Sequence, residues 1–391
     1  MTIPAPPHSA PPRSAPPRSA PLGLLAELTH RCPLACPYCS NPLELEDRAT
    51  ELDTAAWADV FHQAAAMGVL QVHLSGGEPA SRRDLQEITR AASEAGLYTN
   101  LITSAIGLDA ARLARLKEAG LDHVQVSIQD TDPARSDHIA GYAGAHARKL
   151  ALAGAVTGLG MALTINAVIH RANIANLTAM VDLAASLGAG RVEIAHAQYY
   201  GWALRNRDAL MPTRPQIEHA MQEMDQLQAR YAGKLAIDSV IPDYYARRPK
   251  PCMGGWGSRS LNVTPSGLVL PCHAAQTIPG LEFWSVRDHS LADIWTRSPA
   301  FEAYRGTAWM QEPCQSCAFR ERDFGGCRCQ ALAIVGDAAA TDPSCDLSPH
   351  HARIQALAEQ SGASNTTDYA YRGRPERGRS ARKVATPIPA H

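Results

Sequence analysis

The chain has 391 residues, 45% hydrophobic and 19% charged, which is long enough to bury a sizeable core and to form two domains. Its formal net charge of −1 argues against nucleic-acid binding through electrostatic attraction. No secretory leader opens the sequence, and we expect a cytoplasmic protein without a membrane partner, in which the ten cysteines stay reduced and favour metal or redox chemistry.

Both ends of the chain are predicted to be disordered. Residues 1–21 are rich in Pro, Ala and Ser and contain APPRS twice, as flexible or polyproline segments do. Over residues 363–391 Gly, Arg, Pro and Thr dominate. This composition favours a solvated basic tail over a binding arm.

Strand-like and helical patterns alternate between the two ends. The strand-like runs lie at 23–29, 69–75, 97–103, 122–128, 160–168 and 191–196, and the helical patterns at 54–67, 82–95, 109–119, 145–156 and 173–187. A helix at about 214–231 and a short strand at 235–239 follow. Alternation of this kind indicates a parallel sheet with right-handed crossovers. We therefore predict an α/β fold.

One segment within this region needs a separate interpretation. Residues 150–169 carry no charge and are about long enough to span a bilayer. Their small and polar residues make them a poor membrane span, so we interpret them as a helix end, a turn and a buried strand.

Three cysteines, Cys32, Cys36 and Cys39, follow the first predicted strand. Zinc ribbons and ordinary ferredoxins use four protein ligands, whereas a three-cysteine [4Fe–4S] cluster leaves one iron free. The spacing, with Tyr38 before the last cysteine, resembles the radical SAM signature, in which the free iron binds S-adenosylmethionine. Structural zinc is the alternative, but no fourth Cys or His stands at zinc-ribbon spacing.

The position of this triplet also refines the predicted fold. In a (β/α) barrel, a loop that leaves the carboxyl end of a strand faces the active site. A partial (β/α)6 barrel of the radical SAM type over residues 22–240 therefore fits better than an open doubly wound sheet. Residues 241–362 would form a bridging region and a second, cysteine-rich domain.

A second motif, GGEP at residues 76–79, follows the second predicted strand. It resembles the radical SAM element whose backbone and acidic side chain hold the methionine amino group. A glycine pair alone more often marks a turn, but its place after the second strand makes the two motifs specific together. Gly76, Gly77 and Glu78 are therefore candidate cofactor-binding residues.

Polar residues at the ends of strands four to six are further candidates. Ser127 and Gln129 share one face of the fourth strand because side chains alternate along a strand. Asn166 lies on the fifth strand, and His196 and Gln198 follow at the sixth. In radical SAM barrels such residues commonly contact the ribose and carboxylate, although each one taken singly is more often a buried polar group.

Two other features near these strand ends allow more than one interpretation. Arg171 could clamp a carboxylate or form a surface ion pair. The aromatic run at residues 199–202 could line a peptide groove or could serve packing alone.

The second half contains seven more cysteines: Cys252, Cys272, Cys314, Cys317, Cys327, Cys329 and Cys345. Seven cysteines cannot fill two four-ligand sites, and an odd number is a poor disulfide framework. Asp323 would complete the set, since it stands where a typical SPASM domain, the cluster-bearing extension of peptide-modifying radical SAM enzymes, has cysteine. Otherwise it is a loop carboxylate beside Arg320 and Arg322.

Together these motifs resemble the PqqE family, the PqqA peptide cyclases of pyrroloquinoline quinone biosynthesis. The resemblance covers about residues 22–362. It is carried by CPLACPYCSNPLEL at 32–45, LSGGEP at 74–79, VQVSIQD at 124–130, NAVIHRAN at 166–173, YYGWALRNRDALMPT at 199–213, PCMGGWG at 251–257, VTPSGLVLPCHAA at 263–275, CQSCAFRERDFGGCRCQA at 314–331 and DPSC at 342–345.

The resemblance implies two auxiliary clusters besides the three-cysteine cluster. A [2Fe–2S] cluster nearer the barrel would be held by Cys252, Cys272, Cys327 and Cys329. An outer [4Fe–4S] cluster would be held by Cys314, Cys317, Asp323 and Cys345. Because a carboxylate oxygen is a harder ligand than a thiolate, Asp323 would tune electron transfer.

The resemblance also implies the reaction and its partners. A 5′-deoxyadenosyl radical from S-adenosylmethionine would take a hydrogen from a glutamate side chain of the precursor peptide PqqA. The carbon radical would add to a tyrosine ring, and the auxiliary clusters would accept the electron released when aromaticity returns. A separate peptide chaperone, PqqD, would present PqqA, and an electron donor such as a flavodoxin would reduce the enzyme.

Two alternatives remain. The first is another SPASM peptide-modifying enzyme, such as a sulfatase-maturating or thioether-forming maturase, and Asp323 and the Cys327-x-Cys329 spacing argue against it. The second is a non-catalytic iron–sulfur electron carrier or a zinc-stabilised interaction protein. The GGEP motif argues against that, because a carrier needs no iron that binds a substrate.

Overall fold

The computed structural model describes residues 19–240 and 242–373. Most of the predicted N-terminal tail and the last 18 residues of the predicted basic tail lie outside these ranges. Within the described part, no helix combines the length and the apolar character that a membrane crossing requires. Residues 150–169 form the end of a helix, a turn and a strand, as expected.

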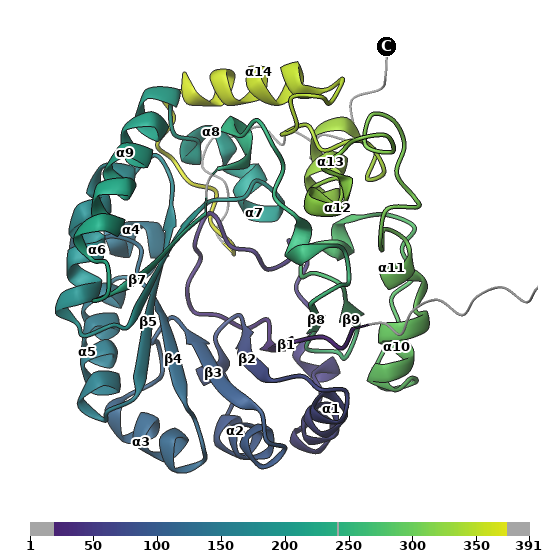
Figure 1. The fold of residues 1–391 in the computed structure, drawn as a ribbon. Coiled ribbons are helices and arrows are strands. Elements are labelled where there is room, and N and C mark those ends of the chain that lie inside the picture. Colours follow the sequence, from purple (N-terminus) through teal and green to yellow (C-terminus); the bar gives the residue numbers. More distant parts are fainter. Residues whose placement is uncertain (1–18, 241, 374–391) are drawn as a thin grey trace, which may run out of the picture.

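One nine-stranded sheet curves through the molecule, with helices along its outer face (Figure 1). Its order is β7-β6-β5-β4-β3-β2-β1-β8-β9. The strands are β1 (Gly23–Thr29), β2 (Gln71–Gly76), β3 (Tyr98–Thr103), β4 (His123–Ser127), β5 (Ala162–Ile169), β6 (Arg191–His196), β7 (Ala236–Val240), β8 (Ser260–Val263) and β9 (Val269–Leu270). The sheet is open, since β7 and β9 form its two edges. The predicted α/β fold is confirmed.

All pairings from β7 to β8 are parallel, and β9 pairs with β8 antiparallel. Parallel neighbours require crossover connections, which here are helical. The longer helices are α1 (Thr54–Ala66), α2 (Leu85–Glu94), α3 (Ala110–Glu118), α4 (Pro133–Ala140), α5 (Ala145–Gly158), α6 (Leu177–Ser186), α9 (Arg214–Arg230), α13 (Arg328–Val335) and α14 (His351–Gly362). Shorter ones are α7 (Gly201–Arg205), α8 (Arg207–Leu210), α10 (Leu291–Arg297), α11 (Pro299–Glu302), α12 (Arg320–Asp323) and the 3-10 turn η2 (Pro79–Ser81).

Local capping explains where several helices begin. The side chains of Asp53, Asp109 and Asp132 accept hydrogen bonds from backbone N–H groups in the first turns of α1, α3 and α4. Thr213 and Gln216 form a reciprocal capping box at the start of α9. Such caps satisfy N–H groups that have no partner within the helix.

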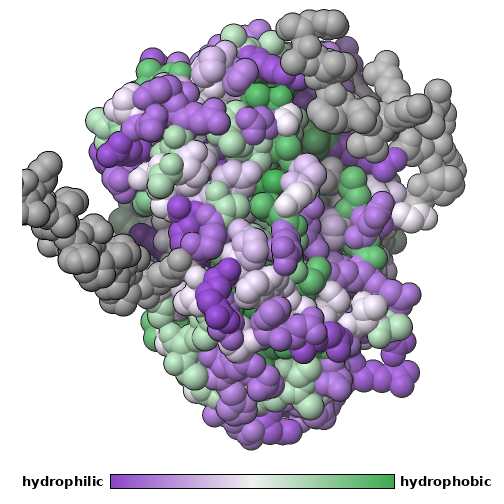
Figure 2. Space-filling model, turned by 90° about the vertical axis from the view of Figure 1, so that its right-hand side faces the viewer, coloured by the Kyte–Doolittle hydropathy of each residue, from purple (hydrophilic) through white to green (hydrophobic). Residues whose placement is uncertain are grey.

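The hydrophobic core lies between the sheet and its covering helices. Leu24 on β1 and Val72 on β2 are fully buried, as are Trp57 and Phe61 on α1, whose rings stack 5.8 Å apart. The face seen in Figure 2 is largely hydrophilic, with hydrophobic residues gathered toward its middle. Apolar side chains on the outer face of the sheet thus hold the helices against it. The polar strand residues discussed below alternate with these apolar ones and point to the inner side of the sheet.

Strands β8 and β9 were not predicted. They come from the cysteine-rich second half, yet β8 pairs with β1 from Gly23 opposite Ser260 to Ala26 opposite Val263. The sheet thus crosses the domain boundary predicted at residue 240. Strand β1, which leads into the first cysteine loop, is held between β2 on one side and a strand of the second half on the other.

Two glycines bring the end of β2 against the end of β1. The N–H of Gly77 donates to the carbonyl oxygen of Thr29 at 2.6 Å, and that of Glu78 donates to Arg31 at 2.8 Å. A Cβ on Gly76 would lie 2.3 Å from the carbonyl oxygen of Thr29, and one on Gly77 would lie 2.4 Å from that of Arg31. The close approach of two backbones therefore requires the glycine pair.

The variant Gly77→Ala should lower the free energy of unfolding by about 1–3 kcal/mol, because the added methyl group displaces packed backbone. Gly154→Ala is the matched control. It lies inside α5 with no atom within 4 Å of the added Cβ, and the change should stabilise by about 0.5–1 kcal/mol. Thermal unfolding of both variants checks this, and equal midpoints would contradict it.

Candidate functional site

The first cysteine loop leaves the carboxyl end of β1 and brings three partly buried cysteines together. Burial raises the pKa of Cys32 to about 12, and repulsion from Cys36 adds to the effect. Burial likewise raises the pKa of Cys36 to about 11, opposed by the positive charge of Lys149. The pKa of Cys39 is raised by burial as well. The structure thus brings the predicted triplet into one buried, mutually repelling group.

The donor chemistry of this loop fits an iron–sulfur cluster. All ten cysteines are free thiols. Within residues 19–240 and 242–373, no three His, Cys, Asp or Glu side chains are arranged to hold a single metal ion. In a cluster each cysteine ligates a different iron, and coordination removes the thiol proton. Three buried soft donors on one loop match that requirement.

Glu78 uses its carboxylate to fix the loop that follows β2. One oxygen accepts hydrogen bonds from the N–H of Ala80 at 3.0 Å and the hydroxyl of Thr103 at 2.8 Å. The other accepts from the N–H and the hydroxyl of Ser104, at 2.7 and 2.5 Å. Burial raises the pKa of Glu78, and these hydrogen bonds oppose the shift. The side chain is therefore fully occupied with protein groups.

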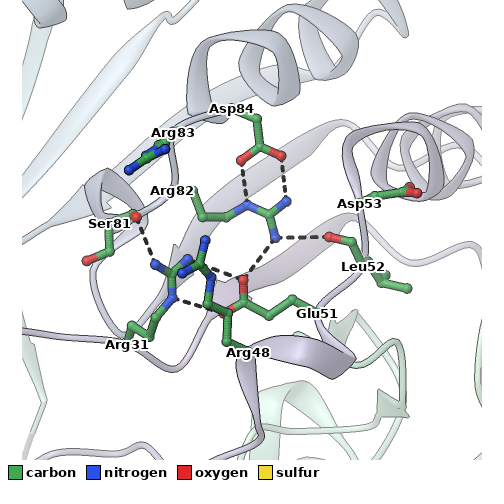
Figure 3. A pocket seen from close by; sticks show the side chains of 9 residues that line it. All are labelled: Arg31, Arg48, Glu51, Leu52, Asp53, Ser81, Arg82, Arg83 and Asp84. Carbon is green, nitrogen blue, oxygen red and sulfur yellow. Dashed lines mark hydrogen bonds and ion pairs between the residues drawn. The ribbon is translucent and has the colours of Figure 1, made fainter.

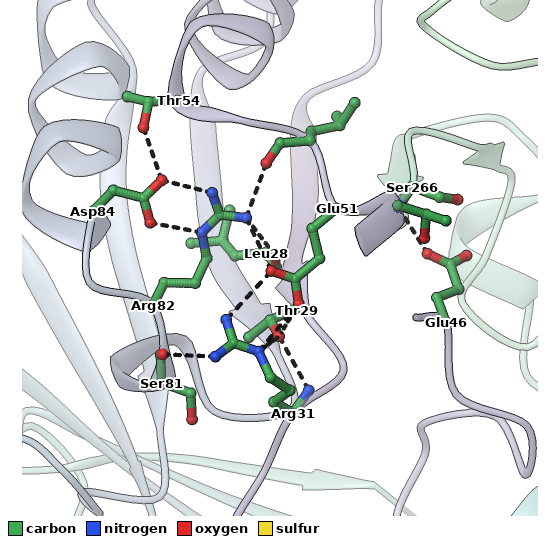
Figure 4. Close-up of polar contacts among 12 residues, drawn as sticks. Leu28, Thr29, Arg31, Glu46, Glu51, Thr54, Ser81, Arg82, Asp84 and Ser266 are labelled. Carbon is green, nitrogen blue, oxygen red and sulfur yellow. Dashed lines mark hydrogen bonds and ion pairs between the residues drawn. The ribbon is translucent and has the colours of Figure 1, made fainter. Parts of the chain in front are cut away.

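An ion-pair network supports the start of the cysteine loop (Figures 3 and 4). Arg82, only 5% exposed, donates to Asp84 at 2.6 Å and to the carbonyl oxygens of Leu28 and Leu52, both at 3.0 Å. Arg31, directly before Cys32, pairs with Glu51 at 3.3 Å. This network joins β1, α1 and the GGEP segment, so it holds the loop at its root.

The same arginines line a pocket on the surface. Figure 3 shows Arg31 and Arg82 directed at acidic and carbonyl partners, with the side chain of Arg48 beside Arg31 and Arg83 at the edge of the group. On the other side of the loop, Glu46 accepts a hydrogen bond from the N–H of Ser266 at 2.7 Å (Figure 4). The loop is thereby tied to the turn between β8 and β9.

Lys149 is a functional candidate that the sequence interpretation missed. Its side chain is fully buried and donates to the amide oxygen of Gln129. Burial lowers the pKa of Lys149, while the nearby Cys36, Cys32 and Glu78 favour its charged form. Helical spacing could have revealed it, because Lys149 shares the buried face of α5 with Ala145, Leu152 and Val156.

The predicted strand-end residues occupy the inside of the sheet, but several are already engaged. The side-chain amide of Asn166 donates to Glu193 at 3.0 Å, and Gln125 donates to the same oxygen at 3.2 Å. Ser127 lies beside Asn166 across β4 and β5. Gln129 contacts Lys149 and the hydroxyl of Tyr38. Ser127 and Asn166 thus share one layer, whereas Gln129 lies at the cysteine loop.

Two histidines near this layer are neutral at physiological pH. Burial lowers the pKa of His170 to about 3 and that of His196 to about 4. His170 Nε2 and His196 Nδ1 are buried without a hydrogen-bond partner among the described residues. Gln198, the other predicted residue of β6, is exposed. A neutral imidazole can donate one hydrogen bond and accept another without carrying a charge.

Arg171 and the aromatic run have structural contacts. The guanidinium of Arg171 donates to the carbonyl oxygen of Met211 at 2.7 Å and to those of Ser361 and Ser364 at the end of α14. All three nitrogens of the guanidinium are thus bonded to backbone carbonyl oxygens, and no ion pair of Arg171 is found within residues 19–240 and 242–373. Tyr199 is buried edge-on against Tyr244, 4.9 Å between ring centroids, which supports the packing interpretation.

Four cysteines of the second half come together in a second group. The thiol of Cys272 contacts those of Cys252 and Cys329, and Cys329 contacts Cys327. Tyr200 packs against this group, and its hydroxyl is hydrogen-bonded to the ring of His273. Burial raises the pKa of Tyr200 well above the usual value, and Cys272, Cys327, Cys329 and Cys39 all add to the shift. Tyr200 therefore belongs with the second group, and Cys39 of the first loop is also near enough to act on its pKa.

The third group contains the remaining cysteines and Asp323. Burial raises the pKa of Cys314, and Asp323 and Cys345 are among the charges that act on it. Cys317 lies one turn after Cys314, with its N–H bonded to that residue's carbonyl oxygen at 3.1 Å. Arg248 donates to the Cys345 sulfur at 3.7 Å and favours the ionised form of Asp323.

The arginines next to Asp323 in the sequence contact other groups. Arg320 pairs with Glu321 at 3.7 Å, and Arg322 lies over the ring of Phe319 at 5.1–5.4 Å together with Arg248. The carboxylate of Asp323 accepts a backbone hydrogen bond from Gly325 at 3.0 Å. It therefore faces Cys314 and Arg248 rather than a neighbouring surface arginine.

Part of the predicted basic tail lies at the site. After α14, residues 363–373 return to the barrel opening, as the yellow segment in Figure 1 shows. Tyr369 packs against His170, 6.3 Å between ring centroids, and Arg372 donates to the carbonyl oxygen of Cys32 at 3.1 Å. We expected disorder from residue 363, but these contacts order the segment up to residue 373.

The geometry can be compared with known proteins. Residues 26–184 match the family model of the radical SAM superfamily, and residues 252–318 match that of an iron–sulfur cluster-binding domain named SPASM. These ranges contain the first cysteine loop and part of the second-half cysteines, respectively.

Solved structures share the fold. SuiB from Streptococcus suis bound to S-adenosylmethionine aligns with a TM-score of 0.70 at 19% identity, over 84% of this chain and 78% of that chain. The native anSMEcpe structure with bound AdoMet aligns with a TM-score of 0.60 at 13% identity, over 87% and 97%. At these identities the comparison supports the fold alone.

Curated relatives are much closer in sequence. The PqqA peptide cyclase of Methylocella silvestris is 62% identical over 94% of this chain and 97% of its own length. That of Methylorubrum extorquens is 58% identical over 90% and 91%. With this identity along nearly its whole length, the chain belongs to the PqqA peptide cyclase family of radical SAM enzymes, which carry an iron–sulfur cluster-binding domain.

Proposed function

We propose that this protein acts on the precursor peptide PqqA in pyrroloquinoline quinone biosynthesis and joins a glutamate and a tyrosine side chain of PqqA by a carbon–carbon bond. The relatives named PqqA peptide cyclase support the substrate. The observation that carries most weight within the chain is the grouping of its free cysteines, with Cys32, Cys36 and Cys39 together on one loop and Cys252, Cys272, Cys327 and Cys329 in contact with one another.

We propose three clusters for the ten cysteines. Cys32, Cys36 and Cys39 would hold the [4Fe–4S] cluster that binds S-adenosylmethionine. The [2Fe–2S] cluster would use Cys252, Cys272, Cys327 and Cys329, and the outer [4Fe–4S] cluster would use Cys314, Cys317, Asp323 and Cys345. When bound, the first cluster and S-adenosylmethionine supply the radical chemistry, and the other two accept electrons.

Contacts to S-adenosylmethionine are proposed for Gly76, Gly77, Glu78, Ser127, Gln129 and Asn166. Because the carboxylate of Glu78 already accepts four hydrogen bonds from protein groups, its role would be to orient the backbone of the glycine loop. Gln129 would act through Lys149, to which it is bonded.

The protein must also remove one electron and one proton from the cross-linked ring. Tyr200 packs against the second cysteine group, and Cys39 of the first group also acts on its pKa, so the electron would pass close to this ring. The unpaired nitrogen of buried His196 is suited to a hydrogen bond inside the barrel rather than to holding the proton, because burial lowers the pKa of His196 to about 4. Burial of the site would keep water from quenching the radical.

The remaining proposals concern organisation and partners. The barrel would span residues 22–240 and the bridging and SPASM region 241–362, joined through the β1–β8 pairing. The chaperone PqqD would present PqqA, and a flavodoxin or similar donor would supply electrons in the cytoplasm.

Anaerobic reconstitution with S-adenosylmethionine, a reductant, PqqA and PqqD tests the function. We expect 5′-deoxyadenosine and a peptide that has lost two hydrogens, with fragmentation locating the bond between Glu and Tyr. Cys36→Ser should abolish both products because it removes a ligand of the first cluster. Formation of 5′-deoxyadenosine with an unchanged peptide mass would show that the substrate is wrong.

Asp323→Ala should remove iron of the outer cluster, because three cysteines would remain without the carboxylate. Asp337→Asn is the matched control, an exposed carboxylate in the same half of the chain. Iron and sulfide analysis with electron paramagnetic resonance would compare the two variants. Equal iron content in Asp323→Ala, Asp337→Asn and the wild type would rule out Asp323 as a ligand.

A further inference from the structure

The segment that follows α14 is anchored to the first cysteine loop at two places. Asn206, 3% exposed, bonds the backbone of Ala370 through both ends of its amide, at 2.7 and 3.1 Å. The same amide donates to the carbonyl oxygen of Pro37 at 2.9 Å. Asn206 therefore joins residues 364–373, which we term the C-terminal strap, to the loop between Cys36 and Cys39.

The second anchor is Arg372. Its Nη2 donates to the carbonyl oxygens of Cys32 at 3.1 Å and Leu34 at 2.7 Å. Its Nη1 is buried and has no hydrogen-bond partner among the described residues. A buried donor without a partner costs free energy, so this nitrogen indicates an acceptor that the protein chain itself does not provide.

Aromatic contacts hold the strap in place around this arginine. The hydroxyl of Tyr371 donates to the carbonyl oxygen of His138 at 2.6 Å, at the end of α4. A Cβ on Gly141 would lie 3.2 Å from the ring of Tyr371 and 3.3 Å from Ala35 of the cysteine loop. The strap, α4 and the loop thus meet at one point, which leaves Arg372 little freedom to turn away.

Charge explains why an arginine is needed there. A cluster bound by three thiolates is anionic, and burying an anion requires compensating positive charge or hydrogen bonds. Lys149 provides one buried cation on the α5 side. Arg372 provides a second on the strap side, where its charge acts on both Cys36 and Cys39.

We propose that Arg372 is a positioning residue for the three-cysteine cluster, in which Nη2 fixes the loop backbone and Nη1 donates a hydrogen bond to a cluster sulfur. The C-terminal strap is then part of the cluster site. Hydrogen bonds and charge near cluster sulfurs raise the reduction potential, because they stabilise the more negative reduced form. The inference rests on the proposed cluster at Cys32, Cys36 and Cys39 and is independent of the peptide substrate.

Arg372→Gln, Arg372→Lys and a chain that ends after Gly373 test this role. Each is reconstituted anaerobically, and the potential of the first cluster is measured by redox titration followed by electron paramagnetic resonance. Arg372→Gln should disfavour the reduced form about tenfold, a shift of about 59 mV to more negative potential for one electron. It should also release iron to a chelator about tenfold faster.

The other two variants separate charge from clamping. Arg372→Lys keeps the charge but lacks the planar fork that spans two carbonyl oxygens. Its potential should therefore lie between those of Arg372→Gln and the wild type, and it should release iron faster than the wild type. The chain that ends after Gly373 loses the other basic residues of the tail but keeps Arg372, and it should match the wild type in both measurements.

Failures of the two proposals can be told apart. The variant Cys36→Ser gives the electron paramagnetic resonance signal expected without the first cluster. If this signal equals that of the wild type, the proposed cluster site is wrong. If that site stands and Arg372→Gln matches the wild type in potential and iron release, the role of Arg372 is wrong. If Arg372→Gln also loses the auxiliary clusters through misfolding, wild-type iron release in Arg372→Lys overturns the proposal.

Discussion

The burial of three thiols in one short loop is the constraint on which the rest of the site depends. Burial and mutual repulsion raise the pKa values of Cys32 and Cys36, so the loop favours neutral thiols until something positive faces it. The surrounding chain stabilises this loop in two ways, by close packing of a neighbouring backbone segment and by positively charged side chains. Gly77 lets the β2 loop press against the loop root, and Lys149 and Arg372 bring buried cations from two different sides.

The shared sheet gives the second half of the chain a fixed relation to this loop. Strand β8 extends the sheet at β1, and the turn after β8 bonds to Glu46 at the far end of the loop. Tyr200, which follows β6, packs against the second cysteine group. Because rigid packed elements connect the groups, the separation between the proposed clusters is set by the fold rather than by a flexible linker.

The features that local interactions determine, such as strand bounds and the positions of motifs, could be predicted from local patterns in the sequence. β1 and β6 begin and end as expected, and the cysteine triplet and glycine pair stand where the strand ends place them. Long-range pairing was not predictable in this way, because a four-residue strand such as β8 has no periodicity long enough to recognise. Arg372 was assigned to a solvated tail because the composition of the C-terminal segment indicates low hydrophobicity. Composition does not reveal that the carbonyl oxygens of Cys32 and Leu34 accept hydrogen bonds from this arginine.

The contact between Arg372 and Cys32 joins residues 340 positions apart. During synthesis the N-terminal part of a chain emerges and begins to fold first. The cysteine loop therefore leaves the ribosome long before its last partner exists. A cluster delivered to the nascent chain would meet an open loop, and the closed site is available only after nearly all of the protein has been translated. The contact between Arg372 and the cysteine loop is accordingly among the last to form.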